Sequence, residues 1–138
     1  MSSSWNMKQG PNFVPAYQVS GTPYVLTETS VGTSTVYKVT FPYLTRWVKI
    51  RNIGSFVLRV GFTEEGVKGT ETRNFFQLNP STSASGFSQS KTDRWEIKCK
   101  ELYFLGQGGT TGFSLAAGLT GIESFPVLTG SNGFKGVG

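Results

Sequence analysis

The sequence predicts one all-β domain, an antiparallel sandwich or barrel, on the basis of three observations. Apolar residues recur in short runs with a period of two, which is typical of half-buried strands. The runs are rich in β-branched and aromatic residues, and clusters of Gly, Ser, Thr, Asn and Pro separate them. No window sustains helical spacing, because Gly118 and Gly121 interrupt the best candidate, residues 114–122.

Composition divides the chain into three parts. Residues 1–15 are polar and include Pro11 and Pro15, which predicts an extended N-terminal arm. Residues 16–130 form the predicted domain, and the Gly-rich residues 131–138 form a C-terminal tail. Within the domain, the apolar runs predict strands at residues 23–28, 35–41, 44–51, 55–62, 73–78, 93–99, 101–105, 112–119 and 125–129.

Alternation along three of these strands predicts which side chains face the core. Successive side chains of a strand point to opposite faces, so every second residue belongs to one side. The predicted inward sets are Tyr37, Val39 and Phe41; Trp95, Ile97 and Cys99; and Phe113, Leu115, Ala117 and Leu119. Cys99 is therefore expected to be a buried small hydrophobe rather than a nucleophile.

The third and fourth predicted strands are expected to form a hairpin, joined by the three-residue loop 52–54 in a type I turn plus bulge. Apolar residues then share the inner face, with Val48 opposite Leu58. On the outer face the same register places Trp47 opposite Arg59, in a predicted cross-strand cation–π contact.

The residue inventory argues against an enzyme. The 138 residues include no His and a single Cys, which excludes Ser-His-Asp and Cys-His sites within one chain and leaves no zinc ligand cluster. Glu64 and Glu65 are expected at a charged hairpin tip, with no second acid placed near them. The Gly-rich residues 106–113 lack the ending of a phosphate-binding loop and predict a hairpin turn. We therefore predict no catalytic activity, no metal and no cofactor.

The charge of the chain limits the classes of partner that it can bind. Thirteen Lys and Arg against eight Asp and Glu give a net charge of +5. Basic residues cluster at Lys91, Arg94, Lys98 and Lys100, which indicates a solvated face or a contact with another subunit or nucleic acid. Nearby aromatic residues alternate onto the core side, so no specific nucleic-acid partner is predicted.

The N-terminal residues contain no apolar leader, and no run approaches the roughly 20 apolar residues of a membrane span. A lone Cys cannot form an internal disulfide. These features predict a protein made in a reducing cytoplasm.

Six segments, taken in order, resemble the penton, or vertex, capsid proteins of large icosahedral double-stranded DNA viruses. They are AYQVSGTPYVLT (16–27), FPYLTRWVKIRNIG (41–54), LRVGF (58–62), NFFQL (74–78), WEIKCKELYFLG (95–106) and LAAGLTGIESFPVLTGS (115–131). The resemblance implies a single eight-stranded antiparallel jelly-roll sandwich. It also implies homopentamers at the fivefold vertices of a virion assembled in the host cytoplasm. The implied partners are a double-jelly-roll major capsid protein and minor capsid proteins, with a membrane involved at most indirectly.

Outward apolar and basic residues are candidates for subunit contacts. Trp47, Val57 and Arg59 are predicted to make a lateral contact, because interfaces are enriched in aromatic residues and Arg. Trp5 and Phe13 are predicted to dock the N-terminal arm on a neighbour. The alternatives are a minor capsid or cement protein elsewhere in the shell and a carbohydrate-binding jelly-roll module.

Overall fold

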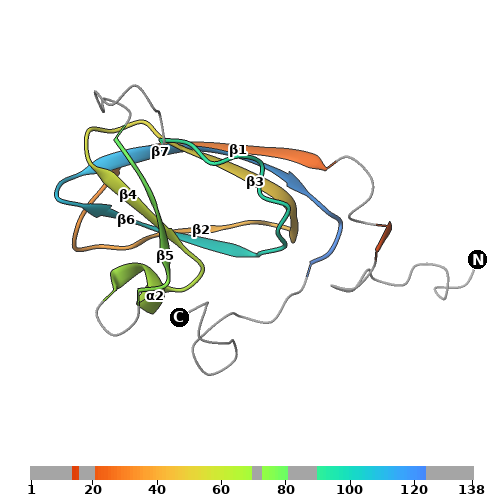
Figure 1. Cartoon of the computed structure of the whole chain (residues 1–138). Helices are drawn as coiled ribbons and strands as arrows, with labels where there is room; N and C mark the ends of the chain where they lie inside the picture. Colours follow the sequence, from red (N-terminus) through yellow and green to blue (C-terminus); the bar gives the residue numbers. More distant parts are fainter. Residues whose placement is uncertain (1–13, 16–20, 70–72, 81–89, 124–138) are drawn as a thin grey trace, which may run out of the picture.

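Seven strands form two antiparallel sheets in the computed structural model, which describes residues 14–15, 21–69, 73–80 and 90–123 (Figure 1). The strands are β1 (Thr22–Val31), β2 (Tyr37–Thr40), β3 (Thr45–Asn52), β4 (Val57–Gly61), β5 (Phe75–Leu78), β6 (Glu101–Gln107) and β7 (Thr111–Leu119). One short helix, α2 (Glu64–Lys68), follows β4. The predicted all-β, antiparallel class is confirmed. The ninth predicted strand, 125–129, and the C-terminal tail lie outside the described residues.

The chain passes from one sheet to the other at four of the six connections between consecutive strands. The first sheet, called sheet A here, has the strand order β1-β7-β3, and sheet B has the order β2-β6-β4-β5. Among the described strands, β4 and β5 are the one pair of chain neighbours that are also neighbours in a sheet. Most of the pairing therefore joins segments far apart in the sequence, for example β1 with β7.

A segment after β5 extends sheet A beyond β3. Residues 90–97 run antiparallel to β3, with bridges at Val48–Trp95 and Arg51–Lys91. Backbone hydrogen bonds of 2.8 and 2.9 Å link Val48 and Trp95 in both directions. Between the bridges the Thr92 hydroxyl accepts from the Ile50 amide at 3.0 Å, in place of a backbone carbonyl. The predicted strand 93–99 is therefore not regular: within it the structure has an isolated bridge at Trp95.

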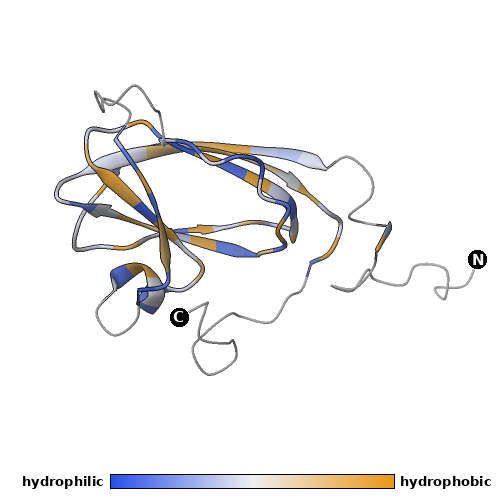
Figure 2. Ribbon diagram, viewed as in Figure 1, coloured by the Kyte–Doolittle hydropathy of each residue, from blue (hydrophilic) through white to orange (hydrophobic). Residues whose placement is uncertain are grey.

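The core fills the space between the two sheets. The Phe104 ring of β6 and the Phe113 ring of β7 stack across it, with centroids 3.9 Å apart and planes within 9°. Both side chains are completely buried. Figure 2 shows apolar and polar residues alternating along the strands. The predicted inward sets are confirmed, since each of their members is buried or partly buried in this core.

The predicted hairpin between β3 and β4 is wrong. The two strands lie in different sheets: Val48 pairs with Ala117 of β7, and Leu58 pairs with Gly106 of β6. The alternation of apolar and polar residues fixes which side chains of a strand face the core. It does not fix which strand lies beside it, so pairing with β7 or β6 satisfies the pattern as well as the predicted hairpin does. The side chain of Asn52 accepts from the Gly54 amide and donates to the Phe56 carbonyl, which turns the chain from sheet A to sheet B.

Two further turn predictions are wrong. Glu64 and Glu65 begin helix α2 rather than a hairpin tip, because the Thr63 hydroxyl caps the helix by accepting from the Gly66 amide at 3.0 Å. Residues 106–113 connect β6 of sheet B to β7 of sheet A and so do not form a hairpin. Gly108 has a φ of 88° in this connection, which favours glycine.

Candidate interaction surface

One side of the sandwich presents aromatic side chains where an edge of each sheet comes close to the other. Strand β5 is the last strand of sheet B, and residues 90–97 run along the edge of sheet A. Phe76 of β5 contacts Trp95 edge-to-face, with ring centroids 5.2 Å apart and an interplanar angle of 87°. Phe76 remains 52% exposed, although its strand parity directs it inward. We call the surface formed by β5 and residues 90–97 around this pair the open edge.

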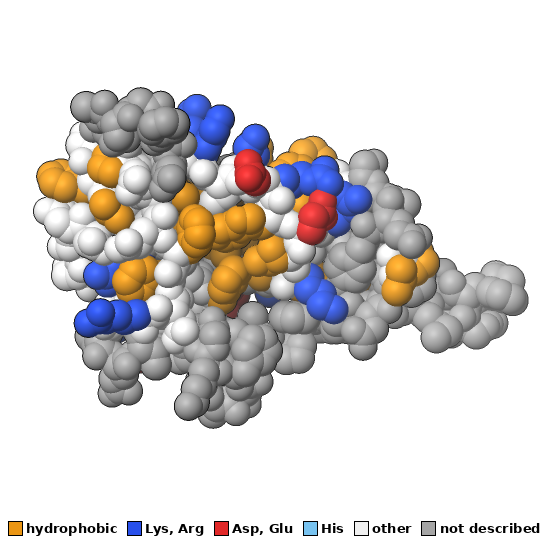
Figure 3. All heavy atoms as spheres, viewed as in Figure 1, with side chains coloured by type: hydrophobic (Ala, Val, Ile, Leu, Met, Phe, Trp, Pro, Cys, Tyr) orange, Lys and Arg blue, Asp and Glu red, His pale blue; other side chains and the backbone are white. Residues whose placement is uncertain are grey.

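A hollow of about 440 Å³ opens at the open edge. Its lining combines the two aromatic rings with polar groups, and includes Phe76, Gln77, Lys91, Thr92, Asp93 and Trp95. Figure 3 shows hydrophobic side chains gathered near the centre of this face, with charged groups around them. Exposed sheet edges and apolar patches rimmed by polar residues are typical sites of contact with a second molecule.

Trp47 lies on the outer face of sheet A and is partly covered by its own chain. Its indole lies directly on Gly118 of β7, where an added Cβ would come within 2.3 Å of Nε1. The guanidinium of Arg94 lies 5.9 Å from the Trp47 ring centroid and also pairs with Glu96. Trp47 therefore has a cation–π partner, but that partner is Arg94.

Arg59 lies on the outer face of sheet B and fastens helix α2. Its guanidinium stacks at 4.3 Å over Phe75, donates to Gln107 Oε1 at 2.9 Å, and donates to the Lys68 carbonyl at 2.8 Å. Val57, half-buried, pairs with Gln107 on the same sheet. The predicted Trp47–Arg59 contact is wrong, because the two residues belong to different sheets. Trp5 and Phe13 lie outside the described residues.

The titratable side chains form no metal-binding cluster in the part of the chain that the structure describes. No three His, Cys, Asp or Glu side chains there come together in a way that could hold a metal ion. None of the described helices is long and apolar enough to cross a bilayer. Cys99 is buried, and this burial raises the pKa of its thiol from 9.0 to about 11, although a hydrogen bond with Thr45 acts in the opposite direction. The thiol stays protonated and unreactive at neutral pH.

We expect this buried thiol to make stability depend on alkaline pH. Its pKa is higher in the folded state than in the unfolded chain, so its contribution is present below pH 9 and is lost as the pH rises toward 11. The loss should reach about 2 kcal/mol. Urea unfolding at several pH values should show it in the native protein and not in Cys99→Ala, while the titration of Tyr103, whose pKa burial also raises, affects both. Parallel pH profiles for the two proteins would contradict this expectation.

Sequence reasoning missed two residues that organise this surface. Phe76 sits at an inward position of its strand, and its exposure follows from the position of β5 at a sheet edge, which alternation does not encode. Asn52 is fully buried and its side chain bonds to three other segments, although asparagine ordinarily signals an exposed turn. Comparison of the chain with protein-family models, with curated proteins and with solved structures finds no match.

Proposed function

We propose that the chain is a structural virion protein that folds as an eight-stranded jelly roll and forms pentamers at the fivefold vertices of an icosahedral capsid. The order of strand pairing carries the proposal. If residues 90–97 are counted as the sixth strand, β6 and β7 become the seventh and eighth. The paired strands are then first with eighth, second with seventh, third with sixth, and fourth with fifth.

This pairing is that of one long antiparallel hairpin wrapped into two sheets. The strand orders become 1-8-3-6 in sheet A and 2-7-4-5 in sheet B. Jelly rolls are built in this way, and they recur in viral capsid and lectin domains. The resemblance of residues 16–131 to vertex proteins favours the capsid among these roles.

The surfaces support a ring of identical subunits. A closed ring uses a heterologous contact, in which two different patches of one subunit meet on its neighbours. The open edge supplies one apolar patch, and the outer face of sheet B, with Val57 and Arg59, supplies another. A stable contact should bury at least about 1,000 Å² in total. Trp47, on the outer face of sheet A, would then contact a different neighbour, and Trp5 and Phe13 remain proposed arm contacts. Those neighbours would be the major capsid protein and minor capsid proteins.

The mass of the purified protein tests the ring. We expect a species of five 15.0 kDa chains in native mass measurements at high concentration. Phe76→Ser should convert it to monomer, since a half-exposed ring at the open edge contributes to the contact more than to the fold. Tyr43→Ser is the control, because Tyr43 is also exposed but lies in the β2–β3 connection. A dimer or trimer as the largest species, or a pentamer that withstands Phe76→Ser, would count against this arrangement.

One observation favours a carbohydrate-binding module as the second candidate. The hollow at the open edge places the Phe76 and Trp95 rings beside Asp93 and Gln77, the combination of stacking and hydrogen-bonding groups that sugars require. Glycan-array binding by the monomer, lost in Asp93→Asn, would support this candidate. The third candidate, a cement protein elsewhere in the shell, has the same fold and differs in its position.

A further inference from the structure

The outer face of sheet A carries most of the net charge of the described residues. Its basic half consists of Lys49 and Arg51 on β3 and of Lys91, Arg94 and Lys98 on the next segment, against two acids, Asp93 and Glu96. The net charge of this half is +3. The remaining described residues are nearly balanced, with six basic and five acidic side chains.

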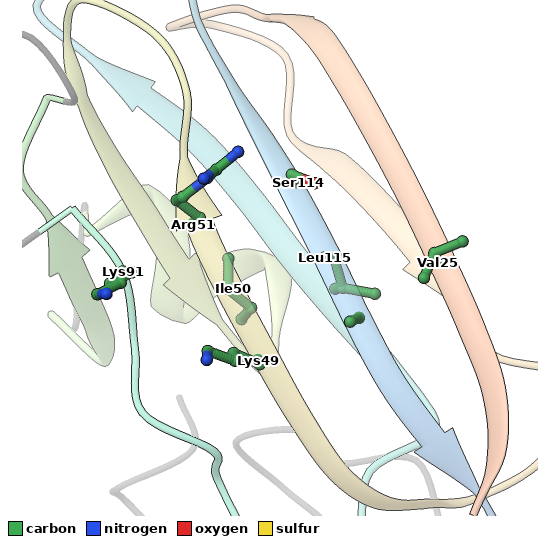
Figure 4. A pocket seen from close by; sticks show the side chains of 8 residues that line it. Val25, Lys49, Ile50, Arg51, Lys91, Ser114 and Leu115 are labelled. Atoms are coloured by element: carbon green, nitrogen blue, oxygen red, sulfur yellow. The ribbon is translucent and has the colours of Figure 1, made fainter.

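Three of these cations border a hollow of about 330 Å³. Figure 4 shows Lys49, Arg51 and Lys91 on one side of it, Val25 of β1 on the other, and Ser114 of β7 between them. The ion pairs between described residues involve Lys38, Lys68 and Arg94, so none of the three cations has a carboxylate partner there. Lys49 and Arg51 lie two residues apart on one face of β3, about 7 Å by strand geometry.

The other half of the same face is apolar or neutral. Val25 is 76% exposed, the largest exposed fraction of the large hydrophobic residues in the described chain. Ser114 and Ala116 line the floor, and no charged side chain lies between them and Val25 in the hollow. A partner that fits this surface must therefore bring anionic groups on one side and an aliphatic group on the other.

These two requirements separate the classes of partner. A nucleic acid would satisfy the cations but would place phosphates or sugars against Val25, and the ring of Trp47 is occupied by Gly118 and Arg94 rather than free for base stacking. A lipid surface usually takes up several large apolar side chains, and this face offers Val25. A second copy of the chain offers little matching acidic surface from the described residues. Its acids outside this face are spread over β1, α2, β6 and the end of the described chain, and Glu64 and Glu101 already pair with Lys68 and Lys38.

We propose that the outer face of sheet A binds an acidic segment of a partner protein. Its carboxylates pair with Lys49, Arg51 and Lys91, and an aliphatic side chain of the same segment packs beside Val25. This surface adjoins the open edge, with Lys91 at the border of both hollows, while Val25, Lys49 and Arg51 lie away from the open edge. The proposal does not depend on a fivefold ring.

Two peptides of equal charge test the proposal, one of alternating Glu and Leu blocks and one in which Ser replaces Leu. In fluorescence anisotropy at low salt, the Glu/Leu peptide should bind more tightly than the Glu/Ser peptide and than duplex DNA or phosphatidylserine vesicles. Lys49→Gln/Arg51→Gln should weaken both peptides by about tenfold, as expected for two lost charge-assisted contacts. Val25→Thr, which keeps the side-chain shape, should weaken the Glu/Leu peptide alone.

Lys38→Gln/Arg73→Gln is the matched control, because it removes two positive charges outside this face. It should leave peptide affinity within about twofold, a difference below 0.5 kcal/mol. An equal loss in the control would mean that net charge alone attracts the peptides and would overturn the proposal. Tighter binding to DNA or to vesicles would overturn it as well. Native mass measurement of the Lys49→Gln/Arg51→Gln protein distinguishes this proposal from the proposed pentamer. An unchanged oligomer together with lost peptide binding supports two independent surfaces.

Discussion

Phe113→Ala is expected to lower the free energy of unfolding by about 3–5 kcal/mol. The Phe113 ring is fully buried, stacks on Phe104 at 3.9 Å and meets Tyr37 edge-to-face at 5.7 Å. These contacts join β7 of sheet A to two strands of sheet B, so truncation removes buried area and leaves a cavity between the sheets. Equilibrium unfolding in urea measures the loss.

Phe76→Ala provides the control for residue type. Phe76 contacts the ring of Trp95, but it is 52% exposed at the open edge. Its truncation should therefore lower the free energy of unfolding by about 1 kcal/mol or less. Similar losses for the two variants would mean that the stacked pair does not hold the sheets together. A large loss at Phe76 with a small one at Phe113 would place the centre of the core elsewhere.

Asn52→Leu is expected to destabilise the fold by about 3–5 kcal/mol, because it leaves several buried polar groups without partners. Asn52 Nδ2 donates to the carbonyls of Phe56, Leu78 and Asn79 at 2.7, 3.1 and 3.1 Å. Its Oδ1 accepts from the Gly54 amide and from the Thr111 hydroxyl, both at 2.9 Å. One buried side chain thus links the end of β3 to β4, β5 and β7.

The control for Asn52 is a hydrogen bond of the same fold that is open to water. Thr27 and Ser114 share one at 3.2 Å between β1 and β7, so Thr27→Ala should cost less than about 1 kcal/mol, since water replaces the lost partner. Unfolding of both variants in urea gives the comparison. If Asn52→Leu costs no more than Thr27→Ala, the side chain does not hold the corner between the sheets.

The sequence was sufficient to predict the approximate positions of the seven described strands and the inward sets, because both follow from local alternation. Tyr37, Val39 and Phe41 contribute to the core as predicted, and so does Cys99. Pairing could not be predicted in this way, since a strand with a buried face fits any partner of matching parity. The loop after Asn52 has the composition of a hairpin turn, and its buried hydrogen bonds depend on strands that are distant in sequence.

The sequence contains start and stop signals for the short helix α2. Thr63 precedes two acidic residues and Gly69 follows Lys68, which are start and stop signals of a helix. Because five residues are too few to show helical periodicity, the alternation of the flanking strands favours a hairpin tip at this position.

The basic face was predicted in part. Lys91, Arg94, Lys98 and Lys100 stand out in the sequence as a local cluster, and Arg94 and Lys98 are exposed, as alternation with the inward Trp95 and Ile97 predicts. Lys49 and Arg51 join them because residues 90–97 pair with β3, about forty positions earlier in the chain. The candidate site therefore follows from tertiary pairing more than from local pattern, as does the exposure of Phe76.

Cryo-electron microscopy of particles that contain this protein tests the proposed role most directly. We expect five copies around each fivefold axis, with density for a two-sheet sandwich whose open edge faces the adjacent copy and whose basic face meets a different protein. Density for this sandwich away from the fivefold axes would contradict the vertex assignment and would favour the cement alternative.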